Sequence, residues 1–209
     1  MDPMNLLSFM LAAVLLIFAP GPDIMYLLAR SLSGGTRQGV TLAAGLASGS
    51  VFHTALVAAG VAAFIQQNPT ALHTLMYVGA AYLLYLAWRT LREGPASIAL
   101  PDAESAGPSG ALYRRGLLMN AMNPKVLLFS IAFFPTFIDP RGALPASVQI
   151  LILGAAFASL SLLCFSFVAV CAGHIRDKIL SWKRFPLVMN RVEAGLLSLI
   201  AAAILLMDL

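Results

Sequence analysis

The sequence predicts an all-α membrane protein with six transmembrane helices. Its 209 residues are 60% hydrophobic and only 11% charged, whereas ordinary soluble domains carry about 25% charged residues. The apolar residues also fall into long runs, and about 20 such residues are needed to cross a hydrocarbon core of about 30 Å. Because a soluble chain of this size cannot bury so much apolar surface, the composition excludes a soluble enzyme.

The six expected spans fall into two groups of three. They cover residues 4–30, 39–65, 71–88, 117–138, 146–172 and 188–208. Between the third and fourth spans, residues 93–109 are rich in Ala, Pro, Gly, Ser and acidic residues, and their prolines exclude a continuous helix. We therefore expect two three-helix halves, residues 1–92 and 115–209, joined by a cytoplasmic linker at 93–114.

The basic residues predict the orientation of these spans. Eleven of the 13 Lys and Arg residues lie in or beside the first, third and fifth connections. They are Arg30, Arg37, Arg89, Arg92, Arg114, Arg115, Arg176, Lys178, Lys183, Arg184 and Arg191. Because basic connections are retained in the cytoplasm, both termini are expected on the outer side of the membrane. The basic residues form no dense patch interleaved with aromatic residues, so we expect no nucleic-acid partner.

Two of the expected spans are interrupted by proline. The first contains the run Pro20–Asp23, and the fourth contains the run Asn123–Lys125. Each proline removes backbone hydrogen bonds that lipid cannot replace, so the freed groups must face protein or a water-filled cavity. Both runs occupy the first helix of their half, and equivalent helices of the two halves run in opposite directions. Paired interruptions of this kind indicate the binding site of a transporter with inverted repeats.

The two breaks are expected at similar depth in the membrane. Gly21 lies nine residues before Arg30, and Pro124 lies nine residues after Arg115. At ~1.5 Å per residue, each break is roughly 13 Å from these charges and near the bilayer midplane. In both places proline suits the first turn of the half-helix that follows. Two half-helix N-termini with free N–H groups and positive dipole ends then favour a carboxylate.

Two charged residues beside the breaks complete a predicted site for a zwitterion. Lys125 would strengthen the attraction for a carboxylate, and Asp23 would hold an ammonium group or a proton, because ionisable residues within spans are costly and usually functional. The predicted substrate-binding residues are Pro20, Gly21, Pro22, Asp23, Asn120, Asn123, Pro124 and Lys125. Two structural alternatives stay open: Asp23 and Lys125 neutralise each other, or Lys125 extends to the cytoplasmic interface.

Other polar residues near the breaks have more than one interpretation. Asn120 and Asn123 precede the second break and are expected to satisfy the carbonyls that it frees. His53 lies midway along the second span, where it either forms a hydrogen bond between packed helices or takes part in proton coupling with Asp23.

Two residue pairs outside the breaks also carry predictions. Gly45 and Gly49 have the spacing of small residues that lets two membrane helices approach closely. Arg191 and Glu193 begin the last span near the cytoplasmic face. They are expected to form an interfacial pair, with gating of the inner mouth by Glu193 as the alternative.

The order of these motifs resembles the LysE/RhtB family of bacterial amino-acid exporters. The resemblance covers Pro20-Gly21-Pro22-Asp23, the glycines Gly35, Gly39, Gly45 and Gly49, the run Asn120-x-x-Asn123-Pro124-Lys125 and the run Phe134-Pro135-x-Phe137. The Pro-Gly-Pro-Asp form is most similar to the homoserine and threonine exporter branch. The resemblance implies a six-span bacterial inner-membrane protein with periplasmic termini that exports amino acids, uses the proton as coupling ion and assembles as a homodimer.

Two other classes of function compete with amino-acid export. A divalent metal-cation exporter would need several oxygen, His or Cys ligands, and the spans offer Asp23, His53 and Glu193. A membrane enzyme or thiol-electron carrier would need a His cluster, paired carboxylates or a Cys-x-x-Cys motif, and the sequence contains none of these. We therefore predict a transporter rather than an enzyme, without a metal site or a cofactor.

Overall fold

A computed structural model describes residues 3–61, 69–94, 108–139 and 142–206 of the chain. All regular secondary structure in these ranges is helical, which confirms the predicted all-α class there. The elements are α1 (Pro3–Phe18), α2 (Pro22–Leu56), the π-helical turn η1 (Val57–Val61), α4 (Pro69–Glu93), α5 (Ser109–Ala121), α6 (Pro124–Phe133), the 3-10 turn η3 (Phe134–Phe137), α7 (Ala146–His174), α8 (Arg176–Ser181) and α9 (Phe185–Leu206).

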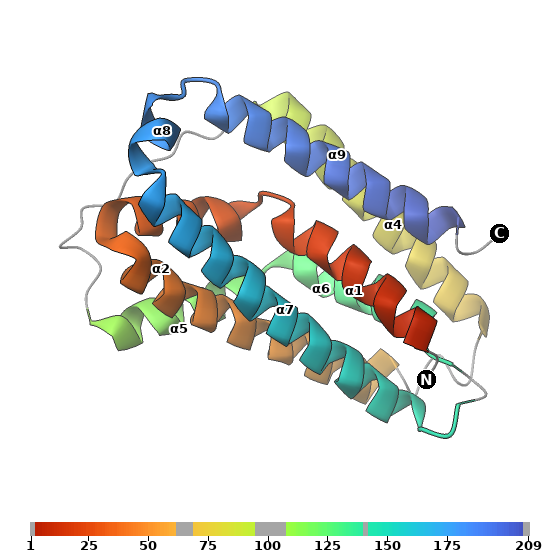
Figure 1. The fold of residues 1–209 in the computed structure, drawn as a ribbon. Coiled ribbons are helices and arrows are strands. Elements are labelled where there is room, and N and C mark those ends of the chain that lie inside the picture. Colours follow the sequence, from red (N-terminus) through yellow and green to blue (C-terminus); the bar gives the residue numbers. More distant parts are fainter. Residues whose placement is uncertain (1–2, 62–68, 95–107, 140–141, 207–209) are drawn as a thin grey trace.

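Helix α2 contains a sharp turn at Gly35. This residue has φ 78° and ψ 173°, a conformation that glycine adopts far more readily than residues with a side chain. Figure 1 shows the chain reversing direction there, so the second part of α2 runs back along the bundle. The expected spans 4–30 and 39–65 are therefore joined by a very short turn, and residues 62–65 lie outside the described ranges.

The helices form two outer groups with two shorter helices between them. The second part of α2 packs along α5 and α7, and α4 packs along α9. Between these groups lie α1, which contacts α7 and α9, and α6, which contacts α4 and α2 (Figure 1). Because α1 precedes the first break and α6 follows the second, both breaks lie inside the bundle.

Glycines allow α2 and α5 to approach closely. A Cβ atom added at Gly49 would lie 2.6 Å from the carbonyl oxygen of Leu117, and one added at Gly116 would lie 2.6 Å from that of Leu42. A Cβ atom at Gly45 would likewise collide with the backbone of Tyr113. The predicted packing role of Gly45 and Gly49 is confirmed, and Gly116 supplies the matching small residue on α5.

An aromatic cluster holds α1 against α6 and η3. Its members are Phe9, Phe129, Phe133, Phe134 and Phe137, all of them buried. The ring centroids of Phe9 and Phe134 are 5.1 Å apart in an edge-to-face arrangement, and those of Phe129 and Phe133 are 4.6 Å apart. Such pairs contribute about 0.5–1.5 kcal/mol each beyond their buried area. The cluster fixes the helices on either side of the breaks.

Some helix boundaries differ from the expected spans. The fifth and sixth spans correspond closely to α7 and α9, and the third corresponds to α4. Helix α5, however, begins at Ser109, inside the expected linker at 93–114 and before the expected span at 117. The first turns of α5 are too polar to be identified as a membrane span, but Leu112 and Gly116 are buried against α2. The linker therefore ends earlier than predicted.

By length and hydropathy, part of the helical bundle is suited to cross a membrane. Among the described residues, the segment Pro22–Gly60, α7 and α9 meet this test. The pair formed by α5 and the helix Pro124–Phe137 is bent by 52° and makes a fourth candidate if it is one span. The apolar helix Met4–Phe18 is shorter than a span. The six-span layout therefore stays a prediction.

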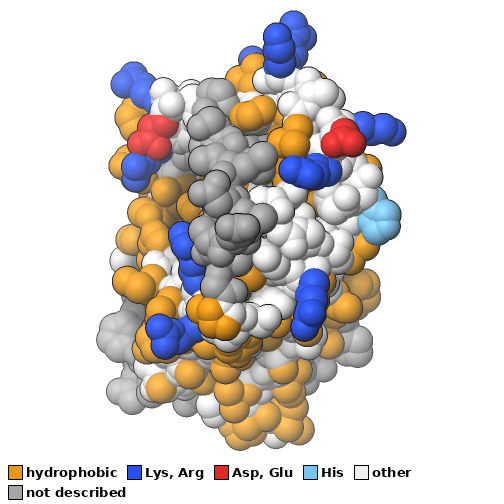
Figure 2. Space-filling view, turned by 90° about the vertical axis from the view of Figure 1, so that its left-hand side faces the viewer, with side chains coloured by type: hydrophobic (Ala, Val, Ile, Leu, Met, Phe, Trp, Pro, Cys, Tyr) orange, Lys and Arg blue, Asp and Glu red, His pale blue; other side chains and the backbone are white. Residues whose placement is uncertain are grey.

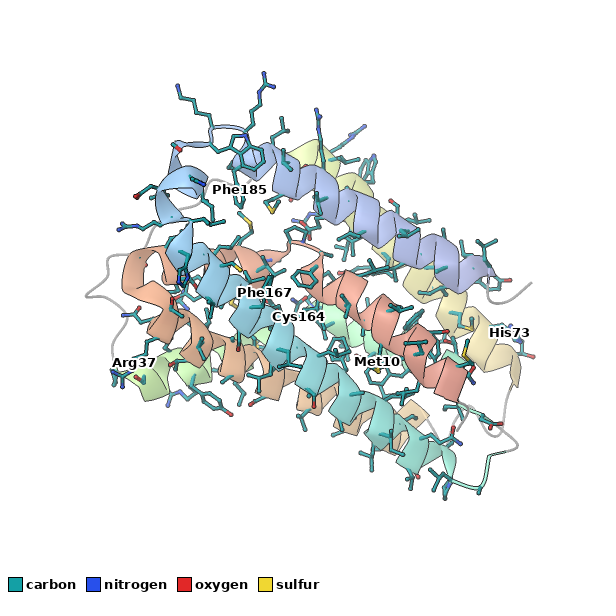
Figure 3. The ribbon with its side chains drawn as sticks, viewed as in Figure 1. Met10, Arg37, His73, Cys164, Phe167 and Phe185 are labelled. Carbon is teal, nitrogen blue, oxygen red and sulfur yellow. The ribbon has the colours of Figure 1, made fainter. Side chains whose placement is uncertain are left out.

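Large apolar side chains cover the outer faces of the helices. Examples with more than half of their surface exposed are Leu11, Phe52, Tyr77, Leu163, Phe167 and Leu199. Figure 3 shows Phe167 on α7, beside Cys164, and Figure 2 shows hydrophobic side chains around the outside of the bundle. An apolar exterior of this extent is typical of a protein surrounded by lipid.

The charged side chains gather at one end of the bundle. Figure 2 looks onto this end, where Lys and Arg side chains are spread over the turn of α2 and the helix ends around α8. The beginning of α1 and the end of α9 lie at the opposite end (Figure 1). Arg37 and His73 mark the two ends in Figure 3. This asymmetry follows the pattern of basic connections in the sequence.

Candidate functional site at the two helix breaks

The first break separates α1 from α2. Helix α1 ends at Phe18, and Gly21 occupies the N-cap of α2 in an extended conformation, with φ −102° and ψ −168°. Pro22 begins α2, where its missing N–H would have no partner in any case. The amide of Met25 donates to the carbonyl oxygen of Gly21 at 3.0 Å, which starts the new helix. The predicted break and the predicted position of its proline are confirmed.

The second break separates α5 from α6. Asn123 is the N-cap of α6, and its side-chain oxygen Oδ1 accepts a hydrogen bond from the backbone amide of Lys125 at 3.0 Å. Pro124 occupies the first helical position, as predicted. The bend between the two helices leaves the N-terminus of α6 facing the first break.

Lys125 joins the two breaks directly. Its Nζ atom donates to the carbonyl oxygen of Ala19 at 2.9 Å, and only 7% of the residue is exposed. The alternative in which this side chain extends to the cytoplasmic interface is therefore wrong. A Cβ atom at Gly21 would lie 2.7 Å from Lys125 Nζ, so the missing side chain of Gly21 leaves the space that the lysine ammonium needs.

Asp23 is held by the other half of the chain. Its Oδ2 atom accepts a hydrogen bond from Asn120 Nδ2 at 2.9 Å, while Oδ1 has no hydrogen-bond partner in the part of the chain that the structure describes. Within those residues, the carboxylate that forms an ion pair with Lys125 is Glu193, with 3.9 Å between Nζ and Oε1. Mutual neutralisation of Asp23 and Lys125 in a direct ion pair therefore does not occur.

His53 supports the second break. Pro124 has no N–H, so the carbonyl of Asn120, four residues earlier, lacks its α-helical donor and accepts a hydrogen bond from the backbone amide of Asn123 at 2.9 Å instead. His53 Nε2 lies 2.9 Å from this carbonyl oxygen, and the residue is fully buried. The tautomer with hydrogen on Nε2 satisfies the carbonyl. His53 thus binds the freed carbonyl of Asn120, and Lys125 binds that of Ala19. The Asn120 side chain instead donates to Asp23, and the Asn123 side chain accepts from a backbone N–H, so neither side chain binds a freed carbonyl as expected.

A cavity of about 460 Å³ opens beside the two breaks. This volume lies within the roughly 300–1,000 Å³ that is usual for small-molecule sites. The lining residues that matter for binding come from α4 and α9 as well as from the breaks. They are Pro20, Gly21, Pro22, Met25, Tyr82, Leu86, Arg89, Glu93, Asn123, Pro124, Lys125, Pro186, Met189, Asn190 and Glu193.

The two charged residues that were expected to share one site differ in their access to the large cavity. Lys125 borders the large cavity, but Asp23 borders a second cavity of only about 20 Å³. Lys125 lines both. Of the residues predicted to share one site, Lys125 borders both cavities, whereas Asp23 and Asn120 border the smaller one.

Residues 14–208 match the sequence model of the LysE type translocator family. This chain is a LysE type translocator. The match extends over both breaks and both halves of the bundle, so the family resemblance of the individual motifs holds for most of the chain. Membership makes the protein a transporter rather than an enzyme, which excludes the membrane enzyme and the thiol-electron carrier.

Individual relatives of this translocator are efflux proteins and membrane proteins of bacteria. The leucine efflux protein of Salmonella typhimurium is 31% identical over 187 residues, covering 90% of this chain and 88% of the relative. The leucine efflux protein of Klebsiella pneumoniae is 31% identical over 193 residues with the same coverage. An uncharacterized membrane protein of Pseudomonas aeruginosa is 34% identical over 168 residues, or 77% of this chain and 76% of the relative. No solved structure matches the chain.

Glu193 of the translocator has a different neighbour from the one expected. Arg191 is exposed, whereas Glu193 is partly buried and faces Lys125, so the expected interfacial pair between Arg191 and Glu193 is wrong. The signal in the sequence is helical spacing, because the α9 residues that line the cavity are Pro186, Met189, Asn190 and Glu193. Counted from Pro186, these residues follow at offsets of three, four and seven, which lie on one helix face, and Arg191 is outside this series.

The described part of the translocator offers little to a metal ion. In residues 3–61, 69–94, 108–139 and 142–206, no group of three or more His, Cys, Asp or Glu side chains could hold one. The charged groups that border the large cavity are instead two basic and two acidic side chains, namely Lys125, Arg89, Glu193 and Glu93. This composition suits an organic ion more than a bare cation.

Proposed function

We propose that this translocator exports amino acids across the bacterial inner membrane. The observation that carries the proposal is the meeting of two half-helix N-termini and the Lys125 ammonium at one cavity. Free backbone N–H groups, helix dipoles and a positive charge together bind a carboxylate. The similarity to leucine efflux proteins adds leucine to the substrates that should be tested first.

The transport cycle that we propose is alternating access around this cavity. The first half, residues 1–92, and the second half, residues 115–209, would move relative to each other as inverted repeats. Equivalent elements pack together in a manner that supports this scheme: the second part of α2 lies along α7, and α4 lies along α9. Six spans are then counted with α1 and the first part of α2 as one broken span, and with α5 and α6 as another.

The orientation in this proposal follows from the charged end of the bundle. The end that carries the basic side chains in Figure 2 would face the cytoplasm, and both termini would face the periplasm. The large cavity includes Arg89 and Glu93 near the end of α4, so it would open toward the cytoplasm, where an exporter collects its substrate.

Proton coupling is proposed to involve Asp23. Its carboxylate is buried, has one oxygen without a partner among the described residues, and borders the smaller cavity together with Lys125. A proton that moves down a membrane potential of 100 mV releases about 2.3 kcal/mol. His53, bound to the Asn120 carbonyl, would keep the second break intact and is a secondary candidate for the proton path.

The experiment that tests the proposed function is counterflow in proteoliposomes. Purified protein would be reconstituted with one unlabelled compound inside, and uptake of the labelled compound would be measured for leucine, threonine, homoserine, lysine and a divalent cation. We expect counterflow of at least one amino acid. Transport of the cation alone, or of nothing, would contradict the proposal.

A lysine variant provides the matched control for this assay. Lys125→Met should reduce amino-acid counterflow about tenfold or more, because a hydrogen bond to a charged group contributes about 1.5–3 kcal/mol. Lys178→Met changes an exposed lysine on α8 and should leave counterflow unchanged. Size-exclusion chromatography in detergent checks that both variants are folded.

A further inference from the structure

We infer that Glu193 binds the ammonium group of the substrate and that, together with Lys125, it makes the large cavity specific for neutral amino acids with apolar side chains. This inference rests on the proposed export of amino acids. Sequence patterns assign the ammonium group to Asp23, but the structure assigns it to a residue on the last helix.

Lys125 and Glu193 place two opposite charges close together at the cavity wall. Lys125 Nζ and Glu193 Oε1 are 3.9 Å apart, and their side chains are 9% and 16% exposed at the wall of the same cavity. At this separation they attract each other but do not close a hydrogen bond, which requires about 3 Å. Each group can therefore still form a charge-assisted hydrogen bond with a ligand in the cavity.

The backbone of Gly21 lies beside both of these charges. A Cβ atom at Gly21 would lie 2.7 Å from Lys125 Nζ and 3.2 Å from Glu193 Oε1. The N-cap of α2 therefore touches both charged groups. A substrate carboxylate at this N-terminus and at Lys125 would bring its own α-ammonium group next to Glu193, because the two groups of an α-amino acid are attached to the same carbon.

The other two charged side chains at the cavity, Arg89 and Glu93, neutralise each other. Arg89 and Glu93 also border the cavity, but they form an ion pair with 2.6 Å between Nε and Oε1 at its exposed edge. Asn190 is engaged as well, since its amide donates to the carbonyl oxygens of Thr90 and Gly94 at the end of α4. The deep part of the cavity thus offers one cation and one anion, which match a zwitterion without net charge.

The rest of the cavity wall near the charged pair is mostly apolar. The side chains of Met25, Leu86, Met189 and Pro186 line the cavity around the charged pair, together with the ring of Tyr82. A substrate side chain would be placed against these groups. Burying a charged side chain there would cost free energy without a partner, whereas an aliphatic side chain would gain from the contact.

Asp23 does not compete for the ammonium group. It borders the smaller cavity, and one of its carboxylate oxygens is bound by Asn120 Nδ2 at 2.9 Å. Lys125 borders both this cavity and the large one, whereas Asp23 does not border the large one. Assigning the ammonium group to Glu193 leaves Asp23 available for the proton in the proposed cycle.

The experiment that tests this inference separates the two charged groups of the substrate. Leucine counterflow in proteoliposomes would be inhibited with 4-methylpentanoate, which lacks the amino group, and with 3-methylbutylamine, which lacks the carboxylate. For Glu193→Gln we expect the KM for leucine and the inhibition constant of the amine to rise about tenfold, while the inhibition constant of the acid changes less than about threefold. Glu193→Asp keeps the charge and should lie between wild type and Glu193→Gln.

The controls distinguish this inference from the proposed function and from misfolding. Arg191→Gln changes an exposed residue of the same helix and should match wild type. If wild type transports leucine and the KM of Glu193→Gln stays within about twofold of it, the inference is overturned while the proposed function stands. Equal weakening of acid and amine in both Glu193 variants also overturns it. Failure of wild type to transport any amino acid would reject the proposed function itself.

Discussion

At the first break, the N-cap of α2 is Gly21, which has no side chain to bind the open N–H groups, whereas at the second break Asn123 caps α6 with its own amide oxygen. The first break also depends on Lys125 to satisfy the carbonyl of Ala19. The second break therefore supplies both the side chain that caps α6 and the Lys125 ammonium group that binds the carbonyl of the first break. The comparison teaches that the first break leaves its N-cap without a side-chain acceptor, as the proposed carboxylate site requires, whereas α6 is capped by its own chain.

The largest expected effect comes from filling the space at the first break. Gly21→Ala would place a Cβ atom 2.7 Å from Lys125 Nζ and 3.2 Å from Glu193 Oε1, which forces the two charges apart. Since a displacement of about 1 Å at a site can cost about a hundredfold, we expect leucine counterflow to fall by about that factor. Gly195→Ala, on the open side of α9, is the matched control and should not affect transport. Normal counterflow in the first variant would show that the close approach at Gly21 has no functional role.

The next effect concerns the driving force rather than the site. Asp23→Asn should abolish the dependence of export on the membrane potential, while leucine counterflow is retained. A proton moved across 100 mV is worth about 2.3 kcal/mol, so the steady-state leucine gradient should fall by up to about fiftyfold. Leucine gradients would be measured in vesicles with an imposed membrane potential of about 100 mV. Asp177→Asn, an exposed residue of α8, serves as the control, and an unchanged gradient in Asp23→Asn would exclude Asp23 from coupling.

A third prediction tests the support of the second break. His53→Ala would leave the Asn120 carbonyl with the Asn123 amide as its remaining donor, and the loss of one buried hydrogen bond costs about 0.5–1.5 kcal/mol. The apparent Tm in detergent should fall, and His53→Gln, which can present an N–H near the position of Nε2, should restore much of it. His174→Ala removes an exposed histidine and should have no effect. A change in the pH profile of transport by His53→Gln, with stability restored, would instead support a role in proton transfer.

The smallest effect is expected at the cap of α6. Asn123→Ala removes the side-chain acceptor for the Lys125 amide, and loss of an N-cap costs about 1 kcal/mol. Asn123→Ser retains an acceptor and should have nearly the wild-type Tm. If both variants lowered counterflow strongly at equal stability, Asn123 would be a substrate ligand in its own right, and the contrast between the two breaks would be smaller than we infer.

The breaks were predictable because their chemistry is local. Pro22 and Pro124 remove backbone donors wherever they occur, and proline favours the first helical turn, so the half-helices could be positioned from the sequence. The close crossing at Gly45 and Gly49 follows equally from residue size. The start of α5 was less predictable, because its polar first turns are stabilised by the packing of α5 along α2 rather than by an apolar pattern.

The partners across the cavity could not be predicted in the same way. Glu193 meets Lys125 only because α9 packs against α4 and lies opposite the breaks, and adjacent residues in the sequence suggested Arg191 instead. Asp23 and Lys125 follow their prolines at similar positions, but whether both border the large cavity depends on the bend at the second break and on Asn120. Long-range geometry of this kind is not encoded in spacing along one helix.

The position of Lys125 as a wall shared by two cavities has a thermodynamic consequence. In the proposed cycle, a ligand in the large cavity and a proton on Asp23 would both change the surroundings of the same ammonium group, because Lys125 borders both cavities. Their binding equilibria are then linked: the factor by which protonation of Asp23 changes leucine affinity equals the factor by which leucine changes proton affinity. Measuring leucine binding at two pH values and proton release on leucine addition would yield the same coupling free energy from two independent directions.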